Sequence, residues 1–352
     1  MIPRFMKAVL LTGHGGTDRL SFREDVPVPE PAAGEVLIEV GAAGVNNTDV
    51  NLRVGWYSKA AGKTPDETAA DSGWTGTALG FPRIQGADAC GRIVAVGGGV
   101  DRRRIGERIL VNPVFYPGPG DPRSAPRYFG SDTDGAFAQF ACVPAANAVT
   151  VASSLSDVEL ASFPCAYLAA ENMLTRANVD AADTVLVTGA SGGVGSAAVQ
   201  LARRRGAAVI AVVSGSKASA VEALGAARVV ARGSDLRAAL GPDSVSVIVD
   251  VVGGDQFPAL LGLLARNGRY SAAGAIAGAE VALDLRTLYL KDLSLFGCTI
   301  PARGVFEALV GHIERGEIRP LVSAIYALRD IAAAQTEFLE KSHVGKIVLV
   351  PG

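Results

Sequence analysis

A glycine-rich segment between an apolar strand and an apolar helix constrains this chain more than any other feature. Residues 184–188 predict a short strand, and residues 194–205 predict a helix with apolar residues at helical spacing. Glycines in such a turn permit a tight bend, a close approach of backbone to phosphate, and close packing of helix on strand. The free N–H groups and positive dipole of the helix N-terminus suit an anion. The residues expected to contact a pyrophosphate are Gly189, Ser191, Gly192, Gly193 and Val194.

The region around this turn alternates strands with helices. Further strands are expected at residues 208–213, 228–231, 245–251 and 268–272. This alternation predicts βαβ units, right-handed crossovers and a doubly wound parallel sheet. Ligands bind such sheets at the carboxyl ends of the strands, so Gly274 is expected to line the same crevice. We therefore predict an α/β fold in which residues 151–300 form a dinucleotide-binding Rossmann domain.

The flanking regions have a different pattern, with short strands separated by glycine and proline. Strands are expected at residues 6–11, 35–40, 91–96, 108–111 and 346–350, whereas residues 12–34 are expected to be rich in turns. This spacing predicts a small, mainly antiparallel β domain formed by residues 1–150 and 301–352. Two long irregular segments, 58–80 and 112–135, interrupt the pattern, and the sequence leaves their roles open.

The residues after the second and third strands of the Rossmann domain bear on the choice between NAD and NADP. A carboxylate after the second strand binds the ribose 2′-hydroxyl of NAD. This chain has Ser214 and Lys217 there instead, and Arg232 follows the third strand. Hydroxyl, ammonium and guanidinium groups suit a 2′-phosphate, which a carboxylate repels. We expect NADP(H) to be the cofactor.

Charge and cysteine content exclude several other classes of protein. The chain has 352 residues, with 33 basic and 35 acidic side chains and a net charge of −2, which disfavours nucleic acid as a partner. Its four cysteines are widely spaced and form no disulfide framework, as is typical of a reducing compartment. With no apolar run long enough to cross a membrane, the expected location is the cytoplasm.

With these residues in hand, the chain resembles the medium-chain dehydrogenase/reductase superfamily, and within it the zinc-free quinone oxidoreductase branch. The motifs that carry the resemblance are residues 34–37, 43–46, 86–91, 189–195, 250–254 and 343–349. The resemblance implies a GroES-like β-rich catalytic domain, a Rossmann domain, an active-site cleft between them and a homodimer.

The resemblance also allows the metal ligands of zinc-dependent relatives to be checked by position. Those relatives place a cysteine at Asn46 and a histidine at Ala87, and their third ligand position falls on Cys165. Because a catalytic zinc needs three protein ligands, no metal site is expected, and Cys165 is expected to be a small buried apolar residue. The segment matching their structural-zinc lobe, residues 99–119, contains no cysteine.

Two residues take candidate catalytic roles from the same resemblance. The asparagine matching Asn46 lies beside the nicotinamide, and the tyrosine matching Tyr57 borders the substrate space. A second tyrosine of the branch is replaced by Asn51, which leaves the proton donor open. Trp74 is expected to line the pocket. The carboxylates of Asp49 and Asp88 are expected to pair with Arg53 or Arg92.

These observations predict an NADPH-dependent oxidoreductase that transfers hydride to a quinone, an enone or a similar activated alkene without zinc. The cofactor carries the hydride, and the protein orients it and excludes water. Two alternatives stay open. One is a zinc-free alcohol or carbonyl dehydrogenase, and the other is a non-catalytic NADP(H)-binding protein with a structural or sensing role.

Overall fold

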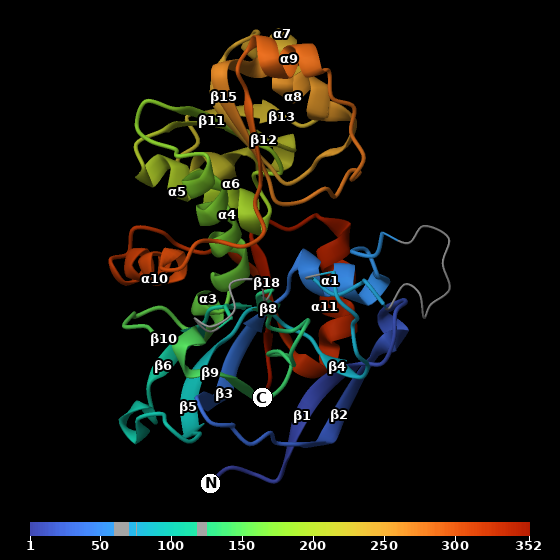
Figure 1. Cartoon of the computed structure of the whole chain (residues 1–352), viewed down its shortest axis with the longest axis vertical. Helices are drawn as coiled ribbons and strands as arrows, with labels where there is room; N and C mark the ends of the chain where they lie inside the picture. Colours follow the sequence, from blue (N-terminus) through green and yellow to red (C-terminus); the bar gives the residue numbers. More distant parts are fainter. Residues whose placement is uncertain (60–69, 75, 118–124) are drawn as a thin grey trace. The chain divides into compact units, whose positions relative to one another are not determined.

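The computed structural model describes residues 1–59, 70–74, 76–117 and 125–352, so the two long irregular segments predicted from the sequence lie partly outside it. The chain forms two compact units (Figure 1). The first unit comprises Met1–Cys165 and Pro320–Gly352, and the second comprises Ala166–Arg319. The domain limits expected from the sequence were residues 150 and 300. The units divide further along the chain, within helix α4 (Pro164–Arg176) and after helix α10 (Val305–Glu314).

The second unit contains the predicted parallel sheet, which is confirmed. Its strands are β11 (Thr184–Val187), β12 (Ala208–Val213), β13 (Arg228–Ala231), β14 (Val245–Asp250), β15 (Leu264–Ala272) and β16 (Ser294–Gly297). They are hydrogen-bonded in parallel in the order β13-β12-β11-β14-β15-β16. From β11 to β13, each new strand is added on one side of β11, whereas β14, β15 and β16 are added on its other side. The strand order therefore reverses between β11 and β14. A doubly wound sheet binds its ligand at that reversal, beyond the carboxyl ends of the strands.

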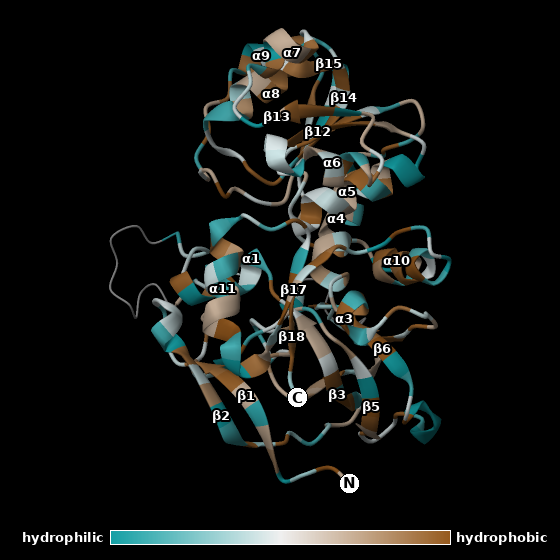
Figure 2. Ribbon diagram, turned by 180° about the vertical axis from the view of Figure 1, so that it is seen from behind, coloured by the Kyte–Doolittle hydropathy of each residue, from teal (hydrophilic) through white to brown (hydrophobic). Residues whose placement is uncertain are grey.

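Helices cover this sheet because its strands are apolar on both faces. Strand β12 reads AVIAVV, without the alternation of a half-exposed strand, and Figure 2 shows it in the hydrophobic colour. The remaining helices of the unit are α5 (Gly193–Arg204), α6 (Ala218–Glu222), α7 (Leu236–Leu240), α8 (Phe257–Leu263) and α9 (Leu285–Leu290). Short 3₁₀ turns, η4 (Gly215–Lys217) and η5 (Gly254–Gln256), precede α6 and α8. The core includes Leu186, Ile248 and Leu260, all fully buried.

The first unit is built mainly from antiparallel strands, as predicted. Its strands are β1 (Phe5–Leu11), β2 (Leu20–Pro27), β3 (Glu35–Gly44), β4 (Arg83–Ile84), β5 (Cys90–Val96), β6 (Arg108–Val111), β7 (Val114–Phe115), β8 (Arg127–Tyr128), β9 (Phe140–Pro144), β10 (Ala148–Thr150), β17 (Val322–Ala327) and β18 (Lys346–Val350). The largest sheet has the order β10-β6-β5-β3-β18-β17, with β9 also paired to β3. Its helices are α1 (Asn47–Val54), α3 (Asp157–Leu160) and α11 (Ile331–Glu340), with 3₁₀ turns at η1 (Thr17–Arg19), η2 (Arg102–Arg104), η3 (Ala145–Asn147) and η6 (Leu328–Asp330).

The final strand returns to the first unit, as the sequence predicted. In the antiparallel pairing of β18 with β3, Val348 lies opposite Gly44. This pairing brings Lys346, at the start of β18, to the end of β3. Residues 12–34, expected to be rich in turns, contain β2, which pairs along β1. Leu20, Phe22 and Val26 of β2 are partly buried against the core, and a charged run at residues 23–25 interrupts this alternating pattern. None of the helices in the described parts of the chain is long and apolar enough to cross a membrane.

Candidate active site

Two glycines of the β11–α5 turn occupy positions that a larger side chain could not. Gly189 has a φ of +56°, and a Cβ there would lie 3.2 Å from methyl groups of Val251 and Val252. At Gly195 a Cβ would lie 2.2 Å from the carbonyl oxygen of Gly189, so only glycine lets α5 approach the turn this closely. Gly192 is the N-cap of α5 in an extended conformation, with ψ of 175°. Two of the glycines are therefore required by geometry.

This turn presents backbone N–H groups at the start of α5. The N–H of Ser196 bonds the carbonyl of Gly192 at 2.8 Å, which closes the first turn of the helix. The N–H groups of Gly193 and Val194 precede that bond and have no intrahelical acceptor. Ser191 lies at the same corner, between Ala190 and the N-cap. Such a cradle fits a dinucleotide pyrophosphate in residue type and in backbone geometry.

Two cations lie close together beyond the ends of β12 and β13. The N–H of Arg232 donates to the carbonyl of Val213 at 2.8 Å, which joins the end of β13 to the end of β12. Burial, and then the neighbouring charge of Arg232, lower the pKa of Lys217. Ser214 caps the short turn that carries Lys217. The structure therefore gathers the three residues that the sequence singled out, and their charge suits an anionic group. Gly274 lies just beyond β15, also at the carboxyl ends of the strands. A Cβ at this position would lie 2.9 Å from the carbonyl oxygen of Val251.

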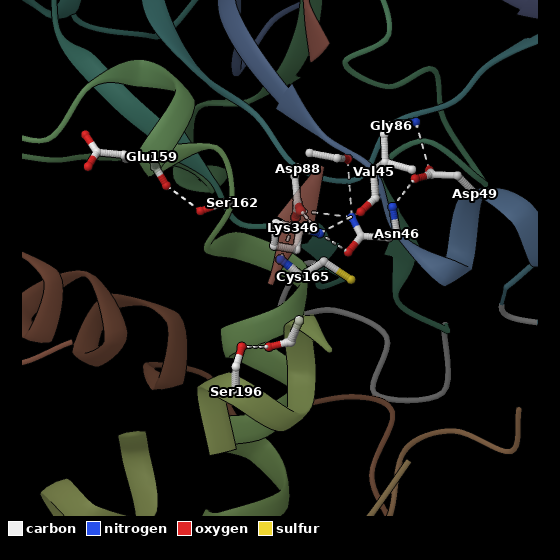
Figure 3. Close-up of polar contacts among 12 residues, drawn as sticks. Val45, Asn46, Asp49, Gly86, Asp88, Glu159, Ser162, Cys165, Ser196 and Lys346 are labelled. Carbon is white, nitrogen blue, oxygen red and sulfur yellow. Dashed lines mark hydrogen bonds and ion pairs between the residues drawn. The ribbon is translucent and has the colours of Figure 1, made fainter. Parts of the chain in front are cut away.

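A buried polar cluster surrounds Asn46 in the first unit (Figure 3). The ammonium of Lys346 donates to Asn46 Oδ1 at 2.5 Å, to Asp88 Oδ2 at 2.9 Å and to the carbonyl of Val45 at 2.8 Å. The amide of Asn46 donates to Asp88 Oδ2 at 2.8 Å. The N–H of Cys165 donates to Asp88 Oδ1 at 2.6 Å. Asn46, Asp88 and Lys346 are 6%, 0% and 3% exposed, so the cluster is a desolvated, hydrogen-bonded ion pair with an amide attached.

The pairing predicted for the two aspartates was wrong. Asp88 pairs with Lys346, which lies 258 residues away in sequence and cannot be found from local spacing. Asp49 turns back to the start of α1, where Oδ2 accepts from the N–H of Asn46 at 2.8 Å and Oδ1 accepts from the N–H of Gly86 at 3.2 Å. Arg53 instead donates to Gln335.

The remaining arginine of that prediction, Arg92, is exposed and donates to the carbonyl of Gly106. The environment of Asp49 is unusual for a carboxylate. Burial, and to a lesser degree the charge of Asp88, raise its pKa to about 7, against the opposing effect of its bonds to N–H groups. The ammonium of Lys346, which is bonded to Asp88, also acts on Asp49 through its charge and lowers the pKa of that carboxyl group.

Aromatic residues stand beside this cluster. The Asn51 amide donates to the hydroxyl of Tyr57 at 3.4 Å, and burial raises the pKa of Tyr57. The hydroxyl of Tyr128 donates to Cys165 Sγ at 3.1 Å, and Trp74 stacks on Tyr128 with ring centroids 4.1 Å apart. Sequence reasoning missed Tyr128 because it lies in an irregular segment with no periodic pattern. The N–H of Trp74 also donates to Ser131 Oγ at 3.1 Å, and its place in a substrate pocket stays a prediction.

The residues at the metal-ligand positions do not fit zinc. The amide of Asn46 is already bonded to Lys346 and Asp88, and Ala87 offers no donor atom. Burial raises the pKa of Cys165 to about 12, so its thiol keeps its proton at neutral pH, whereas zinc binds a thiolate. Within the described ranges, no group of three or more His, Cys, Asp or Glu side chains is arranged to hold a metal ion.

Two family models match the chain, one in each half. The alcohol dehydrogenase GroES-like domain matches residues 32–153, and the zinc-binding dehydrogenase model matches residues 193–315. A Sinorhizobium meliloti protein assigned as an alcohol dehydrogenase is 50% identical in its solved structure, with a TM-score of 0.92 over 100% of this chain and 98% of that one. The chain belongs to the medium-chain dehydrogenase/reductase superfamily. Its second unit is therefore the dinucleotide-binding unit of an oxidoreductase.

Curated relatives place the chain in the quinone oxidoreductase-like branch of this superfamily. An acryloyl-coenzyme A reductase of Metallosphaera sedula is 29% identical over 98% of this chain and 99% of its own length. A quinone oxidoreductase of Rattus norvegicus is 26% identical over 99% of this chain and 98% of its own length. The resemblance predicted from the sequence motifs is thus confirmed at the level of family and fold.

Proposed function

We propose that the protein is an NADPH-dependent reductase of quinones, enones or similar activated alkenes that works without a metal. The observation that carries the cofactor choice is the pair of cations, Lys217 and Arg232, at the ends of β12 and β13 next to the glycine turn. A 2′-phosphate would meet two positive charges and the hydroxyl of Ser214 there, with no carboxylate at the position that favours NAD. The residue types at the former metal positions support a metal-free reaction.

Bound NADPH would supply the hydride, and the protein's part is orientation and charge stabilisation. In the Asn46 cluster, Lys346 holds the amide oxygen and Asp88 accepts one amide hydrogen. The second amide hydrogen has only a 3.4 Å contact with the carbonyl of Gly44. It is therefore the group best placed to donate to a substrate oxygen that gains negative charge. The ammonium bound to Oδ1 strengthens that donor by polarising the amide.

The proton that completes the reduction has two sources under this proposal. One is the hydroxyl of Tyr57, which keeps its proton at neutral pH because burial raises its pKa. The other is water, which suffices for a substrate whose reduced form is a stable enolate or hydroquinone anion. A Tyr57→Phe variant separates them, because only the first source predicts a large fall in kcat with NADPH binding unchanged.

The test is steady-state turnover of a quinone and enone panel with NADPH and with NADH, on protein whose metal content has been measured. We expect turnover with NADPH, at least about tenfold higher kcat/KM than with NADH, in protein free of bound zinc. No turnover by protein that binds NADPH would contradict the proposal. Oxidation of alcohols by NADP⁺ without quinone or enone reduction would instead favour a zinc-free alcohol dehydrogenase; the Sinorhizobium meliloti relative is assigned as an alcohol dehydrogenase.

We also propose a homodimer in the cytoplasm. All four cysteines are free thiols, which supports a reducing compartment. Strand β16 is at the edge of the second unit's sheet, and the apolar side chains of Leu285, Tyr289, Leu290 and Leu295 around it are exposed. Pairing of that edge with a second copy would cover them. Light scattering during size-exclusion chromatography checks this, and a mass near 36.0 kDa would contradict it.

A further inference from the structure

Another buried carboxylate lies at the carboxyl end of the second unit's sheet. Asp250 ends β14 and is 0% exposed, and Thr188 follows β11, the neighbouring strand. The hydroxyl of Thr188 donates to Asp250 Oδ1 at 2.5 Å. Because the strand order reverses between β11 and β14, this bond spans the point at which a doubly wound sheet receives its ligand.

Every group in contact with this carboxylate is a donor. The hydroxyl of Tyr270 donates to Oδ2 at 2.5 Å, and the N–H of Val252 donates to Oδ1 at 2.8 Å. The N–H of Gly253 lies 3.2 Å from both oxygens. An environment made of donors suits an ionised carboxylate, which only accepts hydrogen bonds. None of the ion pairs formed by the described residues includes Asp250, whereas buried charges in proteins are ordinarily paired.

The loop that Asp250 holds packs against the phosphate turn. Gly253 and Gly254 have φ of +64° and +69°, a conformation fixed in part by the carboxylate's bonds to the loop N–H groups. Side chains of Val251 and Val252 approach Gly189 so closely that a Cβ there would lie 3.2 Å from each. The carboxylate of Asp250, for which the described residues supply no cation, therefore lies beside the turn that forms the pyrophosphate cradle.

We infer that the carboxylate of Asp250 makes this crevice favour the oxidised, cationic nicotinamide over the reduced, neutral one. The inference rests on the proposed binding of NADP(H). The glycine turn after β11 belongs to the first mononucleotide-binding half of the sheet, so the nicotinamide half falls to β14, β15 and β16. Asp250 ends the first strand of that half. A fixed negative charge without a cation partner attracts the positive ring of NADP⁺ and leaves neutral NADPH unaffected.

The experiment measures dissociation constants of NADP⁺ and NADPH for the wild type and for Asp250→Asn. We expect NADP⁺ to lose at least about fivefold more affinity than NADPH, the scale for the loss of one charge interaction in a partly screened site. Asp183→Asn is the matched control. Asp183 is also buried, but it precedes β11, at the amino ends of the strands, and it pairs with Arg269. Its NADP⁺ to NADPH affinity ratio should equal that of the wild type.

A second variant separates charge from mere support of the loop. Tyr270→Phe removes one donor that stabilises the ionised carboxylate and leaves the loop N–H bonds of Val252 and Gly253 in place, so the preference between NADP⁺ and NADPH should change. This result decides the matter if Asp250→Asn does not fold. Equal losses of both affinities in Asp250→Asn, or an unchanged preference in Tyr270→Phe, would overturn the inference. Failure of the wild type to bind either nucleotide would instead overturn the proposed function.

Discussion

The two units each bury an aspartate at a polar site, but they treat its charge differently. In the first unit, Asp88 is paired with the ammonium of Lys346, and the pair holds the amide of Asn46 between them. In the second unit, Asp250 is held by hydroxyl and N–H donors, and no described residue forms an ion pair with it. A carboxylate paired with a cation of the protein can orient a neighbouring side chain. A carboxylate held only by hydrogen-bond donors can also attract a positively charged ligand that binds next to it.

The largest effect should come from removing the cation of the first unit. Lys346→Met leaves Asp88 buried without its partner, which should lower the free energy of unfolding by about 3–5 kcal/mol. Denaturant titration measures this loss. The control is Arg23→Met, which breaks the exposed pair of Arg23 and Asp25 and should change stability little. A loss of less than about 1 kcal/mol in Lys346→Met would mean that the cluster tolerates an unpaired carboxylate, and the comparison with Asp250 would fail.

A pH titration of stability should reveal Asp49, the second buried carboxyl group near the ammonium of Lys346. Because the pKa of Asp49 is raised from 3.8 to about 7, the folded protein binds a proton that the unfolded chain releases between those values. Stability from this group is therefore full below pH 3.8 and falls as pH rises to about 7. Asp49→Asn, measured by denaturant titration at several pH values, should lose that slope. An identical slope in the variant would contradict the assignment.

Steric change at the glycine turn of the second unit should weaken ligand binding. Gly195→Val places a side chain against the carbonyl of Gly189, 2.2 Å from the position of its Cβ, and should weaken NADPH binding by at least about a hundredfold, roughly 2.7 kcal/mol. Gly262→Ala in α8 is the control, since no atom lies within 4 Å of a Cβ there and the residue is outside the turn. Calorimetric titration compares them. Similar affinities for both variants would show that the turn is not the pyrophosphate cradle.

The smallest effect concerns the cofactor's 2′-phosphate. Replacing Lys217 and Arg232 together with alanine should reduce the preference for NADPH over NADH by about tenfold, or roughly 1.4 kcal/mol, with NADH affinity nearly unchanged. The residues are partly or fully exposed, so added salt should shrink the difference between wild type and variant. An equal loss for both nucleotides would remove the support for NADPH.

Much of the second unit could be predicted because its signals are local. Apolar strands, a glycine turn and amphipathic helices follow one another within a few residues, and the sheet order is then limited by right-handed crossovers. Tyr270 was not predicted as a partner of Asp250, because nothing local links a strand residue to the end of the neighbouring strand. Strand β17 did carry an alternating pattern, with alternate residues exposed, and the sequence analysis overlooked it.

The candidate site of the first unit was less accessible to sequence reasoning. Asn46 was found through a family motif, and Lys346 belongs to another such motif, yet their contact depends on the antiparallel pairing of β18 with β3. The contact of Tyr128 with Cys165 depends in the same way on segments far apart in the chain. Long-range pairing sets the partners of a buried charge, whereas spacing along the chain reveals only which charges exist.

The return of β18 to β3 also has a consequence during synthesis on the ribosome. The whole second unit, up to Arg319, emerges before the strand that carries Lys346 is made. Until then Asp88 has no cation to meet it, and the β-rich unit must wait as an incomplete intermediate while its neighbour can already fold. A nascent chain stalled before residue 346 should therefore be protease-resistant only in its later-made half.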